Sequence, residues 1–290
     1  MSATATPGVI DRLEVDANGL TFTARAAGPA EGRRVLLLHG FPQSSWCWRG
    51  QLSALAEAGY RAVAPDQRGY STGARPSEVA DYAMEHLLGD VLALADAMEM
   101  DTFDLVGHDC GGLVSWLAAS RHPGRVRSLS VVSTPHPLAL QHALLGGDPA
   151  QAAPAAALDA YCQLDVPERL LLGADGSGSG LLELLTGSGL AEADARVYIS
   201  VLTQPGALTA ALNWYRAMGR TDLSDLAPVA VPTLYVWSSG DGAIGRVAAE
   251  ATAQCVQAPY RFAELDAPHW IPEVAPARLS ELLLSHLSGT

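Results

Sequence analysis

The amino-acid sequence predicts an α/β fold in which a mostly parallel, doubly wound sheet carries helices on both faces. Short, nearly continuous apolar runs recur along the chain, helical stretches lie between most of them, and one long helical stretch interrupts this alternation. Strands buried on both faces of a parallel sheet produce such apolar runs. Their alternation with helices is typical of doubly wound α/β folds.

The first predicted elements are a hairpin and then a series of buried strands. Residues 11–26 contain two alternating runs around Asn18-Gly19, a pair that favours the φ > 0 turn of a hairpin. Helical spacing is found at residues 48–58 and 82–98. The buried strands are expected at residues 35–38, 62–64, 103–106, 129–132, 234–236 and 260–265.

The alternation of strands and helices stops between residues 135 and 220. This stretch is rich in Ala, Leu and Gly and has helical periodicity, except for a loop-like run at residues 173–180 (GADGSGSG). The buried-strand pattern then resumes at residues 231–237. We therefore expect a core of residues 1–134 and 221–290, and a helical cap of residues 135–220 inserted between two strands of the sheet.

Length and charge exclude several classes of partner. The chain has 290 residues, 49% of them hydrophobic, which is enough for one large core with an insertion. It has 18 Lys and Arg against 31 Asp and Glu, a net charge of −13. Such an excess repels phosphate backbones and anionic lipids, so neither nucleic acid nor a membrane is an expected partner. The sequence is compatible with a homodimer.

Cysteine spacing and the opening residues predict a cytoplasmic protein. The four cysteines lie far apart without a CxxC pair, which argues against a disulfide framework or a zinc site and suits a reducing compartment. The opening MSATATPGVIDRLEVD lacks the basic and apolar regions of a secretory signal. No apolar run approaches the ~20 residues of a membrane span. No metal-ligand spacing and no GxGxxG after a strand is found, so no metal and no cofactor are expected.

The strongest functional signal is LVGHDCGG at residues 105–112, directly after a predicted strand and before a helix-like run. Small residues lie on both sides of Asp109, as a sharp strand-to-helix turn requires, because larger side chains would block the close approach of the chain. By itself this aspartate could also be an ordinary turn residue that caps the next helix. Serine is the usual nucleophile at such a turn, so an aspartate there predicts different chemistry.

The replacement of serine by aspartate indicates the class of reaction. An aspartate with a pKa of about 3.9 is ionised at neutral pH and attacks without a general base. A serine that attacked an sp³ carbon would form an ether, which water does not readily cleave. An aspartate forms an ester, which an activated water hydrolyses at the carbonyl. Asp109 therefore indicates displacement at an alkyl carbon, either the opening of an epoxide or the expulsion of a halide.

Two further residues complete a predicted triad. His269 follows the last predicted strand, and Asp241 lies just past the strand that ends at Trp237. Both therefore lie at carboxyl ends of strands, where open α/β sheets place their sites. The chain order of nucleophile, acid and histidine is the order of this fold. Asp241 is expected to orient the imidazole while His269 takes a proton from water.

The segment HGFP after the strand at residues 35–38 predicts an oxyanion hole. A backbone N–H near Phe41, together with that of Cys110, is expected to stabilise the oxyanion formed during ester hydrolysis. His39 itself is expected to be a buried structural hydrogen-bonding residue.

The motifs together resemble a known family. HGFPQSSWCWRGQL, APDQRGYS, LVGHDCGG, STPHP and APHWIPEVAP are similar to the epoxide hydrolases and haloalkane dehalogenases of the α/β-hydrolase fold, over essentially the whole predicted core. The resemblance implies the α/β-hydrolase fold. It also implies that Asp109 is the nucleophile, Asp241 the charge-relay acid and His269 the base, with Phe41 and Cys110 at the oxyanion-hole positions.

The resemblance also implies which residues face the substrate. In epoxide hydrolases of this kind two cap tyrosines protonate the epoxide oxygen, and the segment NWYR gives Tyr215 that role. The second tyrosine is usually found slightly before a segment like VPER, where this chain has AAALDAYCQ, so Tyr161 lies about one helical turn late. Either Tyr161 substitutes, or one tyrosine suffices, or another residue serves. The expected substrate-binding residues are Trp214, Trp270, Tyr161 and Pro42.

Several functions fit the predicted site. A small-molecule epoxide is the first choice of substrate, opened to a vicinal diol. A haloalkane or haloacetate dehalogenase is the alternative, although Cys110 replaces the tryptophan that binds halide in many relatives. A pathway-specific hydrolase or cyclase for a bulky epoxide is a third possibility. A ligand-binding protein without catalysis is disfavoured, because a pure binder has no reason to keep the triad.

Overall fold

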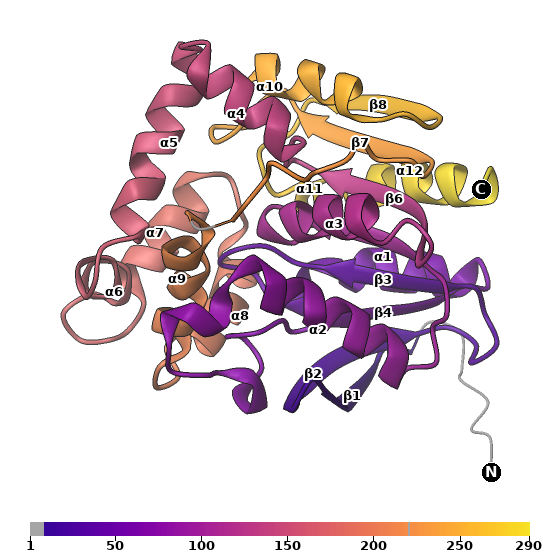
Figure 1. Cartoon of the computed structure of the whole chain (residues 1–290). Helices are drawn as coiled ribbons and strands as arrows, with labels where there is room; N and C mark the ends of the chain where they lie inside the picture. Colours follow the sequence, from indigo (N-terminus) through magenta and orange to yellow (C-terminus); the bar gives the residue numbers. More distant parts are fainter. Residues whose placement is uncertain (1–8, 220) are drawn as a thin grey trace.

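The computed structural model describes residues 9–219 and 221–290, and in them an eight-stranded sheet forms the centre of the molecule (Figure 1). Two predictions fall partly outside the described residues: the absence of a secretory signal, at residues 1–8, and the end of the cap, at residue 220. The strands are β1 (Asp11–Ala17), β2 (Leu20–Ala27), β3 (Arg34–Leu38), β4 (Arg61–Pro65), β5 (Phe103–His108), β6 (Val126–Val132), β7 (Thr233–Ser238) and β8 (Tyr260–Leu265).

The strand order is β1-β2-β4-β3-β5-β6-β7-β8, antiparallel for β1–β2 and β2–β4 and parallel for the rest. The sheet is therefore mostly parallel and doubly wound, as the sequence predicts. Asn18 and Gly19 both have positive φ in the turn of the β1–β2 hairpin, which also agrees with the prediction. All residues of β5 and β7 are buried, whereas the residues of the edge strand β8 are half-buried or exposed.

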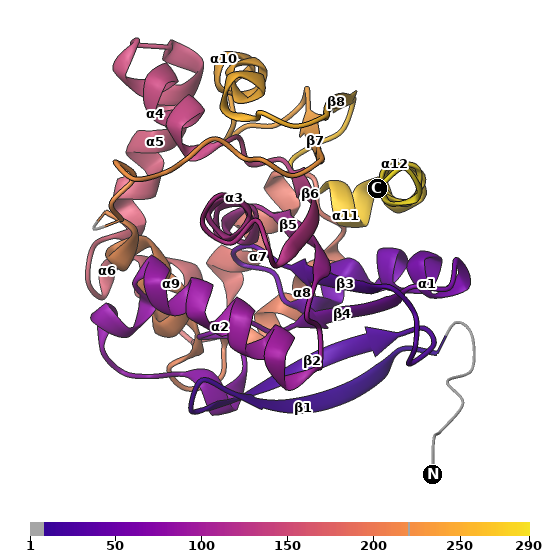
Figure 2. The same ribbon diagram turned by 45° about the vertical axis from the view of Figure 1, so that its right-hand side comes forward.

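Helices cover both faces of the sheet (Figure 2). Helix α1 (Arg49–Glu57) packs with α12 (Pro276–Ser288) on one face, and α2 (Met84–Ala97) packs with α3 (Cys110–Arg121) on the other. The remaining short elements outside the cap region are α10 (Arg246–Ala251), α11 (Ile271–Val274), η1 (Ser45–Trp48), η2 (Thr72–Ala74), η3 (Val79–Tyr82) and η4 (Thr252–Cys255). No helix in the described part of the chain has the length and apolar character needed to cross a bilayer.

The residues between β6 and β7 form the helical insertion, which we define as residues 137–218. Its helices are α4 (Pro137–Leu145), α5 (Pro149–Tyr161), α6 (Val166–Leu172), α7 (Ser179–Gly187), α8 (Glu192–Leu202) and α9 (Ala207–Met218). They lie beyond the carboxyl ends of the parallel strands (Figure 1). The loops after β3, β5, β7 and β8 therefore meet the underside of this insertion, where open α/β sheets bind ligands.

Candidate active site

The turn between β5 and α3 holds Asp109 in a strained backbone conformation, with φ 52° and ψ −124°. Such a conformation is unfavourable for a residue other than glycine and is stable only where the surrounding packing enforces it. A Cβ atom on Gly107 would lie 2.3 Å from Ser115 Oγ, and one on Gly111 would lie 2.4 Å from the Leu38 carbonyl oxygen. The small residues of the motif are thus needed for the tight turn that presents Asp109.

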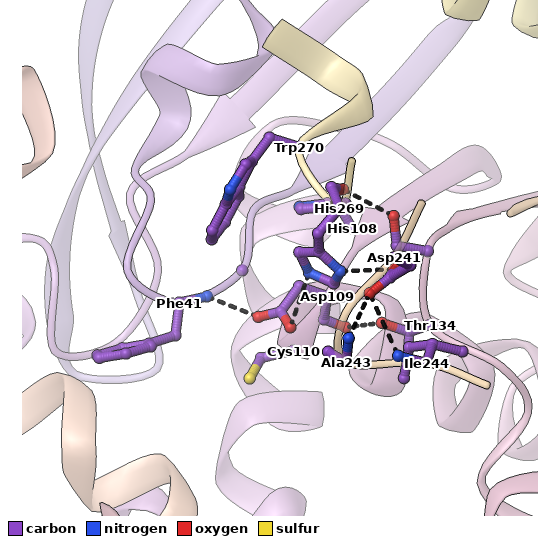
Figure 3. Close-up of polar contacts among 12 residues, drawn as sticks. Phe41, His108, Asp109, Cys110, Thr134, Asp241, Ala243, Ile244, His269 and Trp270 are labelled. Carbon is purple, nitrogen blue, oxygen red and sulfur yellow. Dashed lines mark hydrogen bonds and ion pairs between the residues drawn. The ribbon is translucent and has the colours of Figure 1, made fainter. Parts of the chain in front are cut away.

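The two carboxylate oxygens of Asp109 have different neighbours (Figure 3). The Phe41 backbone N–H donates to Oδ1 at 2.8 Å, while Nε2 of His269 lies 3.4 Å from Oδ2. Burial would raise the pKa of Asp109, but contact with His269 outweighs burial and, with help from His108 and the Cys110 backbone N–H, holds this pKa well below its usual range. The carboxylate is ionised, and its side chain stays 21% exposed, which leaves it accessible.

Asp241 orients the imidazole of His269 from the opposite side. Its Oδ2 lies 2.7 Å from His269 Nδ1, and its Oδ1 accepts hydrogen bonds from the N–H groups of Ala243 (2.8 Å) and Ile244 (3.2 Å). Burial lowers the pKa of His269, but the charge of Asp241 and the contact with Asp109 more than compensate and raise it. The structure thus brings together the three residues that the sequence analysis combines into a triad.

Two tyrosines of the helical insertion pack against the ring of Phe41, whose backbone N–H binds this carboxylate. The ring of Tyr215, from α9, lies 5.2 Å from that of Tyr161, the last residue of α5, and the Phe41 ring lies 5.3 and 5.5 Å from them. Burial, reinforced by the charge of Asp109, raises the pKa of both phenols, so both are protonated at neutral pH. The Cys110 thiol lies 3.6 Å from the Tyr215 hydroxyl.

Comparison with known proteins identifies the family of this chain. Residues 33–157 match the family described as the alpha/beta hydrolase fold. An AB hydrolase superfamily protein of Bacillus subtilis is 34% identical over 95% of this chain and 97% of its own length. Epoxide hydrolase A of Mycobacterium tuberculosis is 30% identical over 95% of this chain and 96% of its own length. The chain belongs to the epoxide hydrolase family of α/β hydrolases.

A solved structure supports the same family membership. The crystal structure of epoxide hydrolase A from Mycobacterium thermoresistibile has a TM-score of 0.83 and 26% identity, and the match covers 97% of this chain and 99% of that one. The family resemblance and the α/β-hydrolase fold predicted from the sequence are therefore confirmed. The chain is an enzyme of the epoxide hydrolase family.

The other three predicted site residues of this epoxide hydrolase family member have different surroundings, and Trp270 contacts the triad. The indole of Trp270 is perpendicular to the His269 ring at 5.1 Å, and its N–H donates to Ser188 Oγ of the helical insertion. Pro42 is buried directly after Phe41. Trp214 instead donates to the Arg68 carbonyl at 2.8 Å. Its ring packs against Tyr70, so it attaches α9 to the core.

The sequence analysis missed several polar residues that support the site. Thr134 Oγ1 donates to the Asp109 carbonyl at 2.8 Å. Gln151 of α5 holds the loop of Asp241 through both ends of its amide, donating to the Ala243 carbonyl and accepting from the Gly245 N–H. Gln43 lies 2.7 Å from Nδ1 of His108, the residue before Asp109. Thr134 and Gln43 lie within motifs that carry the family resemblance, which is a usable signal. Gln151 lies in an Ala-rich helical stretch and has no such signal.

Proposed function

We propose that this enzyme opens an epoxide to a vicinal diol through a covalent ester on Asp109. One observation carries the proposal: an ionised Asp109 has Oδ1 bound to the Phe41 N–H while Oδ2 faces a histidine that Asp241 orients. This is the arrangement of a nucleophile, an oxyanion donor and a base. The family membership makes an epoxide the substrate to test first. The helical insertion would act as the cap that encloses it.

In the first step Oδ2 of Asp109 attacks an epoxide carbon, and the bond between this carbon and the ring oxygen breaks. The released oxygen is an alkoxide, a strong base that needs a proton donor in the transition state. Tyr215 and Tyr161 are the donors best placed for it, because both face the carboxylate from the insertion. One of them gives up its proton and becomes a phenolate. The product of this step is a hydroxyalkyl ester of Asp109.

In the second step His269 removes a proton from water, and the hydroxide attacks the carboxyl carbon of Asp109. Negative charge then develops on Oδ1, which already accepts a hydrogen bond from the Phe41 N–H. The imidazolium protonates the departing diol oxygen, and the proton left on the carboxyl group returns to the phenolate. Epoxide and water are consumed, and the enzyme regains its starting state.

Formation of the ester also prepares the base for this step. Burial lowers the pKa of His269, whereas Asp241 and the ionised Asp109 raise it. Esterification neutralises Asp109 and removes one of the two raising charges. The pKa of His269 therefore falls in the intermediate, when a neutral imidazole is needed to accept a proton from water.

The test is to trap the ester in a His269→Gln variant. Because an ionised carboxylate needs no base, this variant should be alkylated by an epoxide and then stall. Intact-protein mass spectrometry should show protein plus one substrate, and peptide mapping should locate the addition on Asp109. The exposed His86 on α2 provides a matched control, since His86→Gln should turn over without accumulating ester. An unmodified His269→Gln protein beside an active wild type would refute the two-step mechanism.

A further inference from the structure

A row of polar side chains, three of them fully buried, connects the helical insertion to the loop of His269. The Tyr198 hydroxyl of α8 donates to Glu273 Oε1 at 2.6 Å, and Gln43 Nε2 donates to the same oxygen at 2.7 Å. Gln43 Oε1 lies 2.7 Å from His108 Nδ1 and accepts from the Gly40 N–H at 3.4 Å. His108 Nε2 lies 3.0 Å from the His269 carbonyl oxygen. We call Tyr198, Glu273, Gln43 and His108 the Glu273 network. None of its side chains takes part in the proposed reaction.

Counting donors and acceptors shows that the Glu273 network needs one proton. The His269 carbonyl only accepts, so His108 Nε2 must carry a hydrogen. If His108 is neutral, its Nδ1 needs a donor, and the Gln43 NH₂ must point towards it. The Gln43 oxygen then faces Glu273, which must be protonated. That arrangement turns the Gln43 amide over, which exchanges its oxygen and nitrogen. In the orientation of the hydrogen bonds given above, the Gln43 NH₂ donates to Glu273, so Glu273 is ionised and His108 must be an imidazolium. In both arrangements Glu273 and His108 together carry one proton more than an ionised Glu273 and a neutral His108 would.

Two features of the surroundings place this proton on Glu273. The imidazole of His269 lies 4.9 Å from that of His108, so a charged His108 would face a second positive ring. Burial, and then His269, lower the pKa of His108 to about 4, although Asp109 and Asp241 oppose this shift. In addition, Glu273 Oε2 is buried without a partner among the described residues, which disfavours a carboxylate.

The groups packed around Glu273 come from several elements. Arg49 of α1 and Asp194 of α8 act on it from outside the network, and the Cys47 thiol of η1 lies nearby. Burial raises the pKa of Glu273 to about 7, while the hydrogen bonds of Tyr198 and Gln43 and the charge of Arg49 oppose the shift. The neutral and ionised forms of Glu273 are therefore both accessible at physiological pH.

We propose that Glu273 is a positioning residue whose carboxyl proton, acting through the Gln43 amide, keeps His108 in the tautomer that holds the backbone of His269. When Glu273 ionises, the Gln43 NH₂ turns towards it and the Gln43 oxygen faces His108. His108 then moves its hydrogen to Nδ1 and loses the contact with the His269 carbonyl. The network has lost one proton in total, and the loop of the base is less firmly held. This inference rests on the proposed role of His269 in ester hydrolysis.

The first experiment compares ester hydrolysis in wild type and a Glu273→Gln variant across pH. A glutamine at 273 donates to the Gln43 oxygen as a protonated glutamate does, but it does not ionise. The two proteins should hydrolyse the ester at the same rate below pH ~6. At a pH above the pKa of Glu273, wild type should hydrolyse the ester about tenfold more slowly than the variant, because its base is slightly misplaced. Titration of His269 affects both proteins, so their rate ratio isolates Glu273.

A Tyr198→Phe variant tests the same network by shifting the pKa of Glu273 without removing the carboxyl group. The Tyr198 hydroxyl stabilises the ionised Glu273, so its loss raises the pKa of Glu273 and moves the break in the rate ratio to higher pH. Glu281→Gln, which changes an exposed carboxylate on α12, and Tyr82→Phe, which removes a hydroxyl bonded to Pro76, are the matched controls and should leave the break unchanged. A purely structural role for Tyr198 or Glu273 would lower rates without moving the break.

The second readout does not need an epoxide. In ¹⁵N-histidine NMR spectra, His108 should be the neutral Nε2–H tautomer below the break and change its tautomer above it, whereas in Glu273→Gln it should remain Nε2–H throughout. A His108 signal that is the same in both proteins at every pH would overturn the proposal, even if the enzyme is active on epoxides. Conversely, the tautomer change in a protein inactive on epoxides would support the network and refute the proposed function alone.

Discussion

The loops that follow β5, β7 and β8 hold their charged side chains by short hydrogen bonds, whereas α5 and α9 hold their tyrosines mainly by aromatic packing. Asp241 has three polar contacts between 2.7 and 3.2 Å, and its side chain is fully buried. The hydroxyl of Tyr215 has a thiol contact at 3.6 Å. The core thus fixes the charges of the proposed ester chemistry, while the proposed acids are phenols of the helical insertion that are held by weaker contacts. Variants of the two regions should therefore affect different half-reactions.

The largest effect is expected at Asp109, on which both half-reactions depend. Asp109→Asn should lower turnover by about 10⁴-fold or more, because a neutral amide does not form the alkyl ester. Diol release is measured on freshly purified protein and followed over time, since the amide can revert to aspartate by deamidation. Asp101→Asn, which changes an exposed aspartate, is the control. Immediate activity near that of wild type would remove Asp109 from the mechanism.

The next largest effect separates the core from the insertion. Asp241→Asn should slow ester hydrolysis by about 10³- to 10⁴-fold and leave alkylation of Asp109 nearly unchanged. Burial lowers the pKa of His269 and Asp241 more than compensates, so the variant's His269 has a lower pKa. A base works only when deprotonated, and the acid limb of the remaining hydrolysis should therefore move to lower pH. Rapid-quench measurement of each step checks this, and equal slowing of both steps would contradict it.

Tyr215→Phe should show the reverse pattern. Alkylation by an epoxide should slow by about 10²-fold, the usual contribution of one positioned general acid, while ester hydrolysis is unaffected. Tyr161→Phe should also slow alkylation by the epoxide. An alkyl bromide should alkylate Asp109 in wild type and Tyr215→Phe alike, because a departing halide needs no proton. Tyr82→Phe, which removes a hydroxyl that donates to the Pro76 carbonyl, is the control.

Two outcomes would overturn this division of labour. Equal alkylation rates of wild type and Tyr215→Phe with the epoxide would exclude the tyrosine as the acid. Faster turnover of the bromide than of the epoxide by wild type would favour a dehalogenase.

The smallest effect is expected where the helical insertion supports the core. Gln151→Ala removes two hydrogen bonds to the loop of Asp241, at 2.9 and 3.0 Å. Ester hydrolysis should fall about threefold to tenfold, the value of one net hydrogen bond, with alkylation unchanged. Gln141→Ala, at an exposed position of α4, is the matched control. A Gln151→Ala protein that loses alkylation instead would show that α5 acts through its tyrosine.

The parts of the site that depend on local sequence were predictable. Gly107 and Gly111 are required by the tight turn at Asp109, and this requirement is visible in the motif alone. Asp241 and His269 could be assigned because each lies a few residues past the end of a strand, and the carboxyl ends of parallel strands meet at one edge of the sheet. The sheet itself was predictable because its central strands are mostly apolar and are buried along their whole length.

The contacts that join separate elements were not predictable. Tyr161 seemed one helical turn late along the chain, yet the end of α5 brings its ring to Tyr215. Glu273 and Gln43 are 230 residues apart in sequence and share a hydrogen bond of 2.7 Å. The sequence by itself determined which segments form buried strands and tight turns, and therefore which residues form the triad, because these features follow from neighbouring residues. Only the tertiary structure decided which tyrosines face Asp109 and where the buried proton can lie, because both depend on how the helical insertion packs against the core.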